Sequence, residues 1–210
     1  AALLARALEY HDRAGAIRER AWLLRRLHWT HLSRGEYEKA IELAIRSRTD
    51  SVTVGDVDGE AKANMGIGQA YLAQKEHGEA IAYLTRAIDQ LTSIGAAHFE
   101  AECLWLLGRA RCETGALDES GELLDRSLSM IRRIGDRDDE FRILTDMARL
   151  KIARGDYEAA RERATEARDI ASSLKNKQGV DEAEIELARS AELSVTKGSP
   201  DRQELSGRAL

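Results

Sequence analysis

Proline is almost absent from this sequence of 210 residues, which contains a single one, and aromatic residues make up only 5%. Because proline breaks helices, its scarcity leaves long helices possible along nearly the whole chain. The low aromatic content disfavours a β-sandwich, whereas 43% hydrophobic and 33% charged residues suit amphipathic helices. The composition therefore predicts an all-α protein.

Cysteine and long apolar runs are also scarce. Cys103 and Cys112 lie about two and a half turns apart on one predicted helix, so they face opposite sides and cannot form a disulfide. No apolar run approaches the ~18 residues of a membrane span, and the N-terminus lacks the pattern of a secretion signal. We expect a cytoplasmic protein with no membrane partner.

An excess of basic residues is missing as well, since the formal net charge is -5. Proteins that bind nucleic acid in general are usually basic, so we expect no nucleic-acid partner.

Motifs for a metal, a cofactor or catalysis are incomplete. Asp56-x-Asp58-Gly59 resembles the start of a calcium loop but lacks the later acidic ligands, which favours helix capping. Gly66-x-Gly68 lacks the third glycine of a dinucleotide loop. His28 and His31 have the spacing to share a metal, yet no third ligand follows from the sequence. We therefore expect no metal, no cofactor and no enzymatic activity.

One pattern does recur along the chain, at an interval of 40 residues. Glycines mark two registers of this repeat, one with Gly35, Gly115 and Gly155 and another with Gly15, Gly55, Gly95 and Gly135. A small residue follows at Ala40, Ala80, Ser120 and Ala160. A fixed period of this length indicates a repeat architecture, in which each unit buries its apolar face against its neighbours.

The repeat predicts one solenoid over residues 1–210 with partial units at both ends. Complete units are expected at 16–55, 56–95, 96–135 and 136–175, a partial N-terminal helix at 1–15, and a partial fifth unit with a tail at 176–210. Ala1–Tyr10 matches the second helix of a unit without its first helix, which is consistent with a segment of a longer protein. Lys197-Gly198-Ser199-Pro200 interrupts the pattern, and Asp201–Leu210 has the length of a short terminal helix.

Each unit is expected to form two antiparallel helices joined by a short turn. The first helices are predicted at Ala16–Arg34, Asp56–Lys75, Ala96–Thr114, Arg137–Arg154 and Gly179–Val195. The second helices are predicted at Glu36–Arg48, His77–Ser93, Leu117–Ile134 and Tyr157–Leu174. Glycines close these helices, while Asp56 and the acidic residues after Gly135 suit the N-termini that follow.

The units share a set of large, small and aromatic positions. The second unit has Asn64, Ile67-Gly68, Tyr71 and Ala80, the third has Leu104, Leu107-Gly108, Gly115 and Ser120, and the fourth has Leu144, Met147-Ala148, Gly155, Tyr157 and Ala160. This pattern resembles the tetratricopeptide repeat. The family's usual period is 34, so we expect longer helices to contain the six extra residues. Gly55-Asp56-Val57-Asp58-Gly59-Glu60-Ala61 is similar to the turn of a subgroup found in spindle-orientation adaptors and in bacterial regulatory proteins.

The resemblance implies a right-handed superhelical solenoid of about four to five repeats, in which the first helices line a concave groove that binds partners. Small residues at Gly68, Gly108, Ala148 and Ala188 would let helices approach closely, and His28 departs from this pattern in the first unit.

Helical spacing selects one stripe of the first helices as the wall of this groove. It contains all three tryptophans and several arginines: Trp22, Arg25, Arg26, Trp29, Lys62, Met65, Gln69, Trp105, Arg109, Arg142, Arg149 and Arg189. Tryptophan and arginine are enriched at binding hot spots. We expect a partner segment with acidic residues and at least one bulky apolar side chain.

Two alternative interpretations of the stripe remain open. The arginines have acidic neighbours on their own helices, such as Asp146 near Arg142, Glu113 near Arg109 and Glu186 near Arg189, so they are also compatible with ion pairs inside the protein. Trp22 and Trp29 are also compatible with a role in covering the end of the stack or meeting a preceding unit.

The sequence thus predicts a non-enzymatic scaffold that binds a partner peptide or helix. One alternative is a regulatory module of a larger signalling protein that senses a peptide or an effector domain. Another is an oligomerisation spacer that uses the apolar ends near Tyr10 and Leu193. The oligomeric state does not follow from the sequence.

Overall fold

The computed structural model describes residues 2–198, and every element within that range is an α-helix. The all-α prediction is confirmed. The chain divides into two compact units, Ala1–Met130 and Ile131–Leu210. The boundary falls near the end of α7 (Leu117–Ile134).

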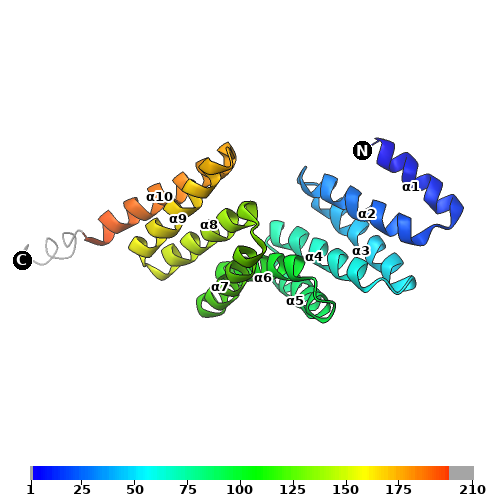
Figure 1. Ribbon diagram of the computed structural model, residues 1–210, viewed down its shortest axis with the longest axis horizontal. Coiled ribbons are helices and arrows are strands. Elements are labelled where there is room, and N and C mark those ends of the chain that lie inside the picture. The colour runs from blue at the N-terminus through cyan, green and yellow to red at the C-terminus, as the bar shows by residue number, and fades with distance from the viewer. Residues whose placement is uncertain (1, 199–210) are drawn as a thin grey trace, which may run out of the picture. The chain divides into compact units, whose positions relative to one another are not determined.

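The first unit contains the helices α1 to α6 and most of α7. Their bounds are α1 Ala2–Ala14, α2 Ile17–Leu32, α3 Tyr37–Thr53, α4 Val57–Ala73, α5 His77–Ser93 and α6 Ala97–Glu113. From α1 to α6 each helix packs against the next (Figure 1), so helices joined by short turns run in opposite directions. In addition α2 contacts α4, and α4 contacts α6, so these first helices of successive repeats form one continuous layer.

The second unit contains α8 (Arg137–Arg154), α9 (Tyr157–Ser173) and α10 (Lys177–Gly198). Here α8 packs on α9, α9 on α10, and the two first helices α8 and α10 also touch. The predicted interruption is wrong for Lys197 and Gly198, because α10 continues through both. Ser199-Pro200 and the predicted helix at Asp201–Leu210 lie outside the described residues.

The turns between helices recur every 20 residues, so two helices with their turns account for the period of 40 residues. The helices α3 to α9 have 17 or 18 residues, which confirms that longer helices contain the extra residues of each repeat. The residue with a positive φ recurs at Gly15, Gly35, Gly55, Lys75, Gly95, Gly115, Gly135, Gly155 and Lys175. Glycine adopts this left-handed conformation without strain, so the predicted turn positions are confirmed, and two lysines occupy it where glycine is missing.

Aspartates cap three of the helices at their N-termini. The Asp56 carboxylate accepts a hydrogen bond from the Gly59 amide at 3.0 Å, and Asp136 accepts one from the Asp139 amide at 3.1 Å. Asp156 accepts one from Ala159 at 3.2 Å. These bonds satisfy amide groups that have no partner inside the helix. The capping role predicted for Asp56 is confirmed.

Small residues allow the paired helices to approach each other closely. A Cβ atom on Gly68 would lie 2.7 Å from Leu84 Cγ, and one on Gly108 would lie 2.9 Å from Leu124. Both leucines are fully buried, so the glycines provide the space that these side chains fill.

In the first repeat, His28 stands at the position of these glycines. It is 1% exposed, and its Nδ1 donates a hydrogen bond to the Ala40 carbonyl at 2.9 Å. The residue at the position of Leu84 is Ala44, which is also buried. The large and small partners are therefore exchanged, and the imidazole occupies the core in place of a leucine.

Candidate partner-binding surface

The structure places all twelve predicted stripe residues on first helices of the repeats. In the first unit, Trp22, Arg25, Arg26 and Trp29 lie on α2, Lys62, Met65 and Gln69 on α4, and Trp105 and Arg109 on α6. In the second unit, Arg142 and Arg149 lie on α8 and Arg189 on α10. Since first helices of each unit contact in order, each unit carries its own part of the stripe.

The exposed indoles of the stripe lie on α2. Trp22 is 51% exposed and Trp29 is 39% exposed, although α1 packs against the same helix. Seven residues are about two helical turns, so both rings project from one face of α2. The Arg26 guanidinium lies 5.6 Å from the centre of the Trp22 ring, a distance at which the cation and the ring attract each other. This face combines large apolar area with positive charge.

Arg25 lies between the two indoles in sequence and is half-buried. Its Nη1 atom is buried and has no hydrogen-bond partner among the described residues. Burial lowers the pKa of this guanidinium, while the nearby charges of Asp56 and Asp58 act in the opposite direction. An arginine keeps its charge in proteins, so this guanidinium carries a buried donor that lacks an acceptor.

The part of the stripe on α4 and α6 is mostly buried. Met65 is 2% exposed and Trp105 is 8% exposed, so neither offers much surface to a partner. Lys62 bonds to Asp58 at 2.7 Å and lies 4.1 Å from the centre of the Phe99 ring. Arg109 lies 5.8 Å from the centre of the Trp105 ring. Gln69 has a buried Oε1 atom without a partner.

The arginines of the second unit are paired inside the protein. Arg149 donates to Asp146 and to Glu186, each at 2.7 Å. Burial alone lowers the pKa of Arg149, but these two carboxylates more than offset it, and the pKa is raised. The Arg189 guanidinium lies 3.8 Å from the same Glu186.

Arg142 pairs with Asp139 at 3.7 Å, and Asp146, the neighbour suggested by the sequence, binds Arg149. The self-paired interpretation of the arginines therefore describes the second unit. The exposed indoles, with the Arg26 guanidinium beside Trp22, lie in the first unit.

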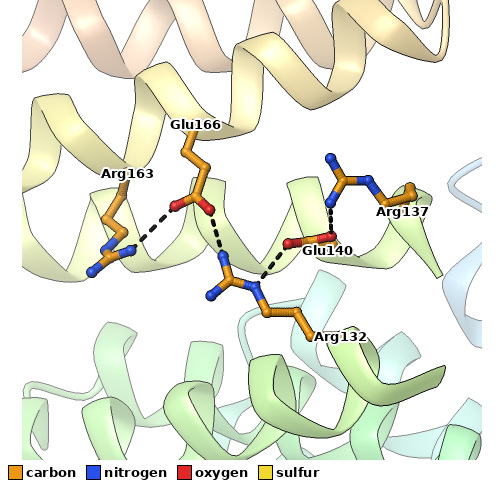
Figure 2. Close-up of polar contacts among 5 residues, drawn as sticks. All are labelled: Arg132, Arg137, Glu140, Arg163 and Glu166. Carbon is orange, nitrogen blue, oxygen red and sulfur yellow. Dashed lines mark hydrogen bonds and ion pairs between the residues drawn. The ribbon is translucent and has the colours of Figure 1, made fainter. Parts of the chain in front are cut away.

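Sequence reasoning missed a group of carboxylates that pair with arginines of other helices, among them the buried Asp50, Glu100 and Glu140. Asp50 accepts two hydrogen bonds from Arg20, at 2.7 and 2.6 Å, and Glu100 pairs with Arg126. In the second unit Arg132 bridges Glu140 and Glu166, as Figure 2 shows, while Arg137 and Arg163 bind the same two carboxylates from either side. Glutamate recurs at Glu60, Glu100 and Glu140, and this recurrence was the sequence signal for the two buried glutamates Glu100 and Glu140.

The Arg132 network connects three helices of the second unit. Its guanidinium projects from the end of α7 to Glu140 on α8, at 2.8 Å, and to Glu166 on α9. Glu140 is 4% exposed, so its charge depends on these arginines for compensation. The network therefore ties these three helices together.

The other motifs found in the sequence have structural roles. His28 faces the core and His31 pairs with Glu36, so the two histidines do not share a metal. Cys103 and Cys112 are not joined by a disulfide, in agreement with the helix spacing. Burial raises the pKa of the Cys103 thiol, which leaves it a poor nucleophile. A hollow of about 530 Å³ is lined by α9 side chains and not by first helices.

Comparison with known proteins gives a family match for part of the chain. A family model described as the tetratricopeptide repeat matches residues 100–173, which run from the first turn of α6 to the end of α9. No curated protein matches the sequence.

Solved structures with similar folds extend the likeness over most of the chain. The apo form of RapI has 12% identity and a TM-score of 0.69, with 90% of this chain and 65% of RapI covered. A putative kinesin light chain from Podosopora anserina with nearly identical TPR-like repeats has 17% identity and a TM-score of 0.67, with coverages of 90% and 92%. The Rap conjugation gene regulator of the plasmid pLS20, in complex with the Phr* peptide, has 16% identity and a TM-score of 0.62, with coverages of 89% and 61%.

These identities are low, so the likeness shows a tetratricopeptide-like fold and not a shared activity. The chain spans less than two thirds of the length of the two Rap proteins. Among the described helices, none combines the length and apolarity that a membrane-spanning helix needs.

Proposed function

We propose that this chain is a non-enzymatic module that binds a segment of another protein on the first helices of its repeats. The observation that carries the proposal is the exposed face of α2, where Trp22 and Trp29 present apolar area beside the Arg26 cation. Large exposed aromatic groups are costly in water unless a partner covers them, and tryptophan and arginine dominate binding hot spots.

The chemistry of this face favours a partner segment with a bulky apolar side chain and a carboxylate. The indoles provide a surface for the apolar group. The unpartnered Nη1 of Arg25 provides a hydrogen-bond donor for the carboxylate, in a place where burial strengthens such a bond. The pLS20 Rap regulator, whose structure contains a peptide, has a similar fold and supports the general mode of binding.

The remaining stripe residues have secondary roles in this proposal. Lys62, Met65, Gln69, Trp105 and Arg109 form the neighbouring layer on α4 and α6, and we propose that it supports the α2 face. Arg142, Arg149 and Arg189 are already engaged with carboxylates in the second unit, so a partner would have to compete for them.

A peptide titration tests the proposal. The probe is a fluorescently labelled segment of glutamate and aspartate with one phenylalanine, and its matched control replaces the acidic residues with lysine. We expect the acidic probe to bind, and Trp22→Ala or Arg25→Gln to weaken binding by about tenfold, which corresponds to ~1.4 kcal/mol. Arg46→Gln on the exposed face of α3 serves as the control variant and should leave the affinity unchanged.

Equal binding of both probes, or no effect of the α2 variants, would remove this face from the proposed function. Fluorescence anisotropy at two salt concentrations provides the readout. A contact with the exposed Arg26 guanidinium predicts weaker binding at the higher salt concentration, because salt screens exposed charges.

As the second candidate we propose a regulatory module of a larger protein. The partial coverage of the two Rap proteins supports it, since a repeat segment then accounts for part of a longer regulator. Small-angle scattering with and without the acidic probe distinguishes the candidates, because a sensor predicts a change of compactness on binding. An oligomerisation spacer predicts self-association in sedimentation, and a strict monomer at high concentration excludes that role.

A further inference from the structure

His28 lies where three helices of the first unit meet. The residue belongs to α2, its Nδ1 donates to the Ala40 carbonyl on α3, and its ring packs against Gly66 on α4. A Cβ atom at Gly66 would lie 2.7 Å from His28 Nε2, so the imidazole fills the space that this glycine leaves. The ring therefore connects α2 to both of its neighbours.

The second ring nitrogen has no partner. Because the Ala40 carbonyl can only accept, Nδ1 carries the hydrogen and Nε2 holds a lone pair. Nε2 is buried and makes no hydrogen bond within the described part of the chain. A proton added to Nε2 would create a positive charge in the core with no acceptor to stabilise it.

We propose that His28 is a pH-sensitive joint, which holds α2 against α3 and α4 only while its imidazole is neutral. Acidification places a charge between the helices, and the contact between α2 and α4 then loosens. Trp29 reports on this event, since its ring centre lies 5.5 Å from that of His28 in an edge-to-face contact. The inference does not depend on the proposed binding function.

The direction of the pH effect follows from the energetics of the buried ring. Burial lowers the pKa of His28 below its ordinary value of 6.5, and the nearby charge of His31 acts in the same direction, while the bond to Ala40 partly opposes both. The unfolded chain therefore binds the proton more readily than the folded chain. Stability is fully present above a pH of about 6.5 and is lost as the pH falls below it.

His31 is the one described titratable group whose charge acts on His28. It lies on the same helix and pairs with Glu36. From α3 the group facing His28 is the Ala40 carbonyl, and from α4 it is the Gly66 backbone. Neither neighbour titrates.

A nuclear magnetic resonance titration of the histidine ring signals in the full chain tests the joint directly. We expect the His28 signal to titrate below the ordinary histidine pKa of 6.5, and the Trp29 indole signal to change over the same range. Titration of His28 at or above its ordinary pKa of 6.5 would overturn the proposal.

Unfolding by urea at about pH 7.5 and about pH 5 provides the second test. The variant His28→Gly with Ala44→Leu copies the Gly68 and Leu84 pair of the next repeat, so it removes the titrating ring and keeps the core filled. We expect the urea midpoint of this variant to decrease on acidification, but by less than half of the decrease that the original chain shows. His28→Asn, whose amide can replace the Nδ1 donor, should behave in the same way.

His31→Gln is the matched control and should retain most of the pH effect, because burial is a larger cause of the lowered pKa of His28 than the charge of His31. An equal fall of the midpoint in the original chain and in both His28 variants would contradict the inference. If the double variant does not fold, His28→Asn and the ring titration still decide the question.

Discussion

At the scale of residues, the side chains that the sequence assigned to one stripe differ in how deeply they are buried. The three tryptophans share the predicted stripe, yet Trp22 and Trp29 are exposed and Trp105 is 8% exposed. The difference follows their places in the repeat. Trp105 occupies the same place in its repeat as the buried Met65, whereas Trp22 and Trp29 occupy the places of the half-buried Lys62 and Gln69.

Substitution of Trp105 should therefore affect folding more than binding. Trp105→Ala leaves a large cavity in the first unit and is expected to lower the free energy of unfolding by about 3–5 kcal/mol. Trp22→Ala removes an exposed ring and should cost less than about 1 kcal/mol. Urea unfolding followed by circular dichroism measures both, and equal losses for the two variants would contradict the burial described above.

The twelve stripe residues show the limit of reasoning from helical spacing alone. Spacing correctly assigns them to the first helices, but it cannot tell how many neighbours cover each helix. Met65 and Trp105 become buried because α4 and α6 contribute to the core on more than one side. Arg149 becomes paired because Glu186, on a helix far away in sequence, lies beside it. The binding role of the stripe stays a prediction.

At the scale of helices, the sequence was most informative at the turns. Glycines at fixed spacing predicted where the chain adopts a left-handed conformation, and the predicted bounds of His77–Ser93 and Leu117–Ile134 agree with α5 and α7. Lys75 and Lys175 were not identified because their residue type gives no signal for a positive φ. Only their place in the 20-residue spacing indicates it.

The left-handed lysine turn offers a test of this spacing. Lys75 has a φ of 64°, which is strained for a residue with a side chain, so Lys75→Gly is expected to raise the free energy of unfolding by roughly 0.5–1 kcal/mol. The neighbour Gln74 has a φ of -81°, and Gln74→Gly should be destabilising. Melting temperatures of the two variants should therefore shift in opposite directions. A lower melting temperature for Lys75→Gly would show that the turn is not strained.

The N-terminal caps provide a second test at this scale. Asp56→Ala removes the acceptor for the Gly59 amide and is expected to cost about 1 kcal/mol. Glu76 occupies the same position before α5 without a side-chain bond to the helix, so Glu76→Ala should have little effect. Thermal unfolding compares the pair. Similar losses for both variants would argue against a specific capping bond at Asp56.

At the scale of the whole molecule, each repeat uses the same few packing positions, with local exchanges of large and small residues. The period of 40 residues predicted the order and type of the helices, because every repeat solves the same packing problem. It did not predict the two compact units, whose boundary lies near the end of α7 and has no distinct sequence mark. The expected single solenoid over residues 1–210 therefore stays a prediction, as does the cytoplasmic location.

The central claim is that the open face of α2 binds an acidic segment of a partner, and the three tryptophans make it directly measurable. The chain has one indole N–H signal for each, so nuclear magnetic resonance can follow all three while the glutamate- and aspartate-rich probe with one phenylalanine is added. We predict that the Trp22 and Trp29 signals shift progressively and saturate together, with a smaller change for the buried Trp105. Saturable binding of the probe that leaves Trp22 and Trp29 unshifted would contradict the account.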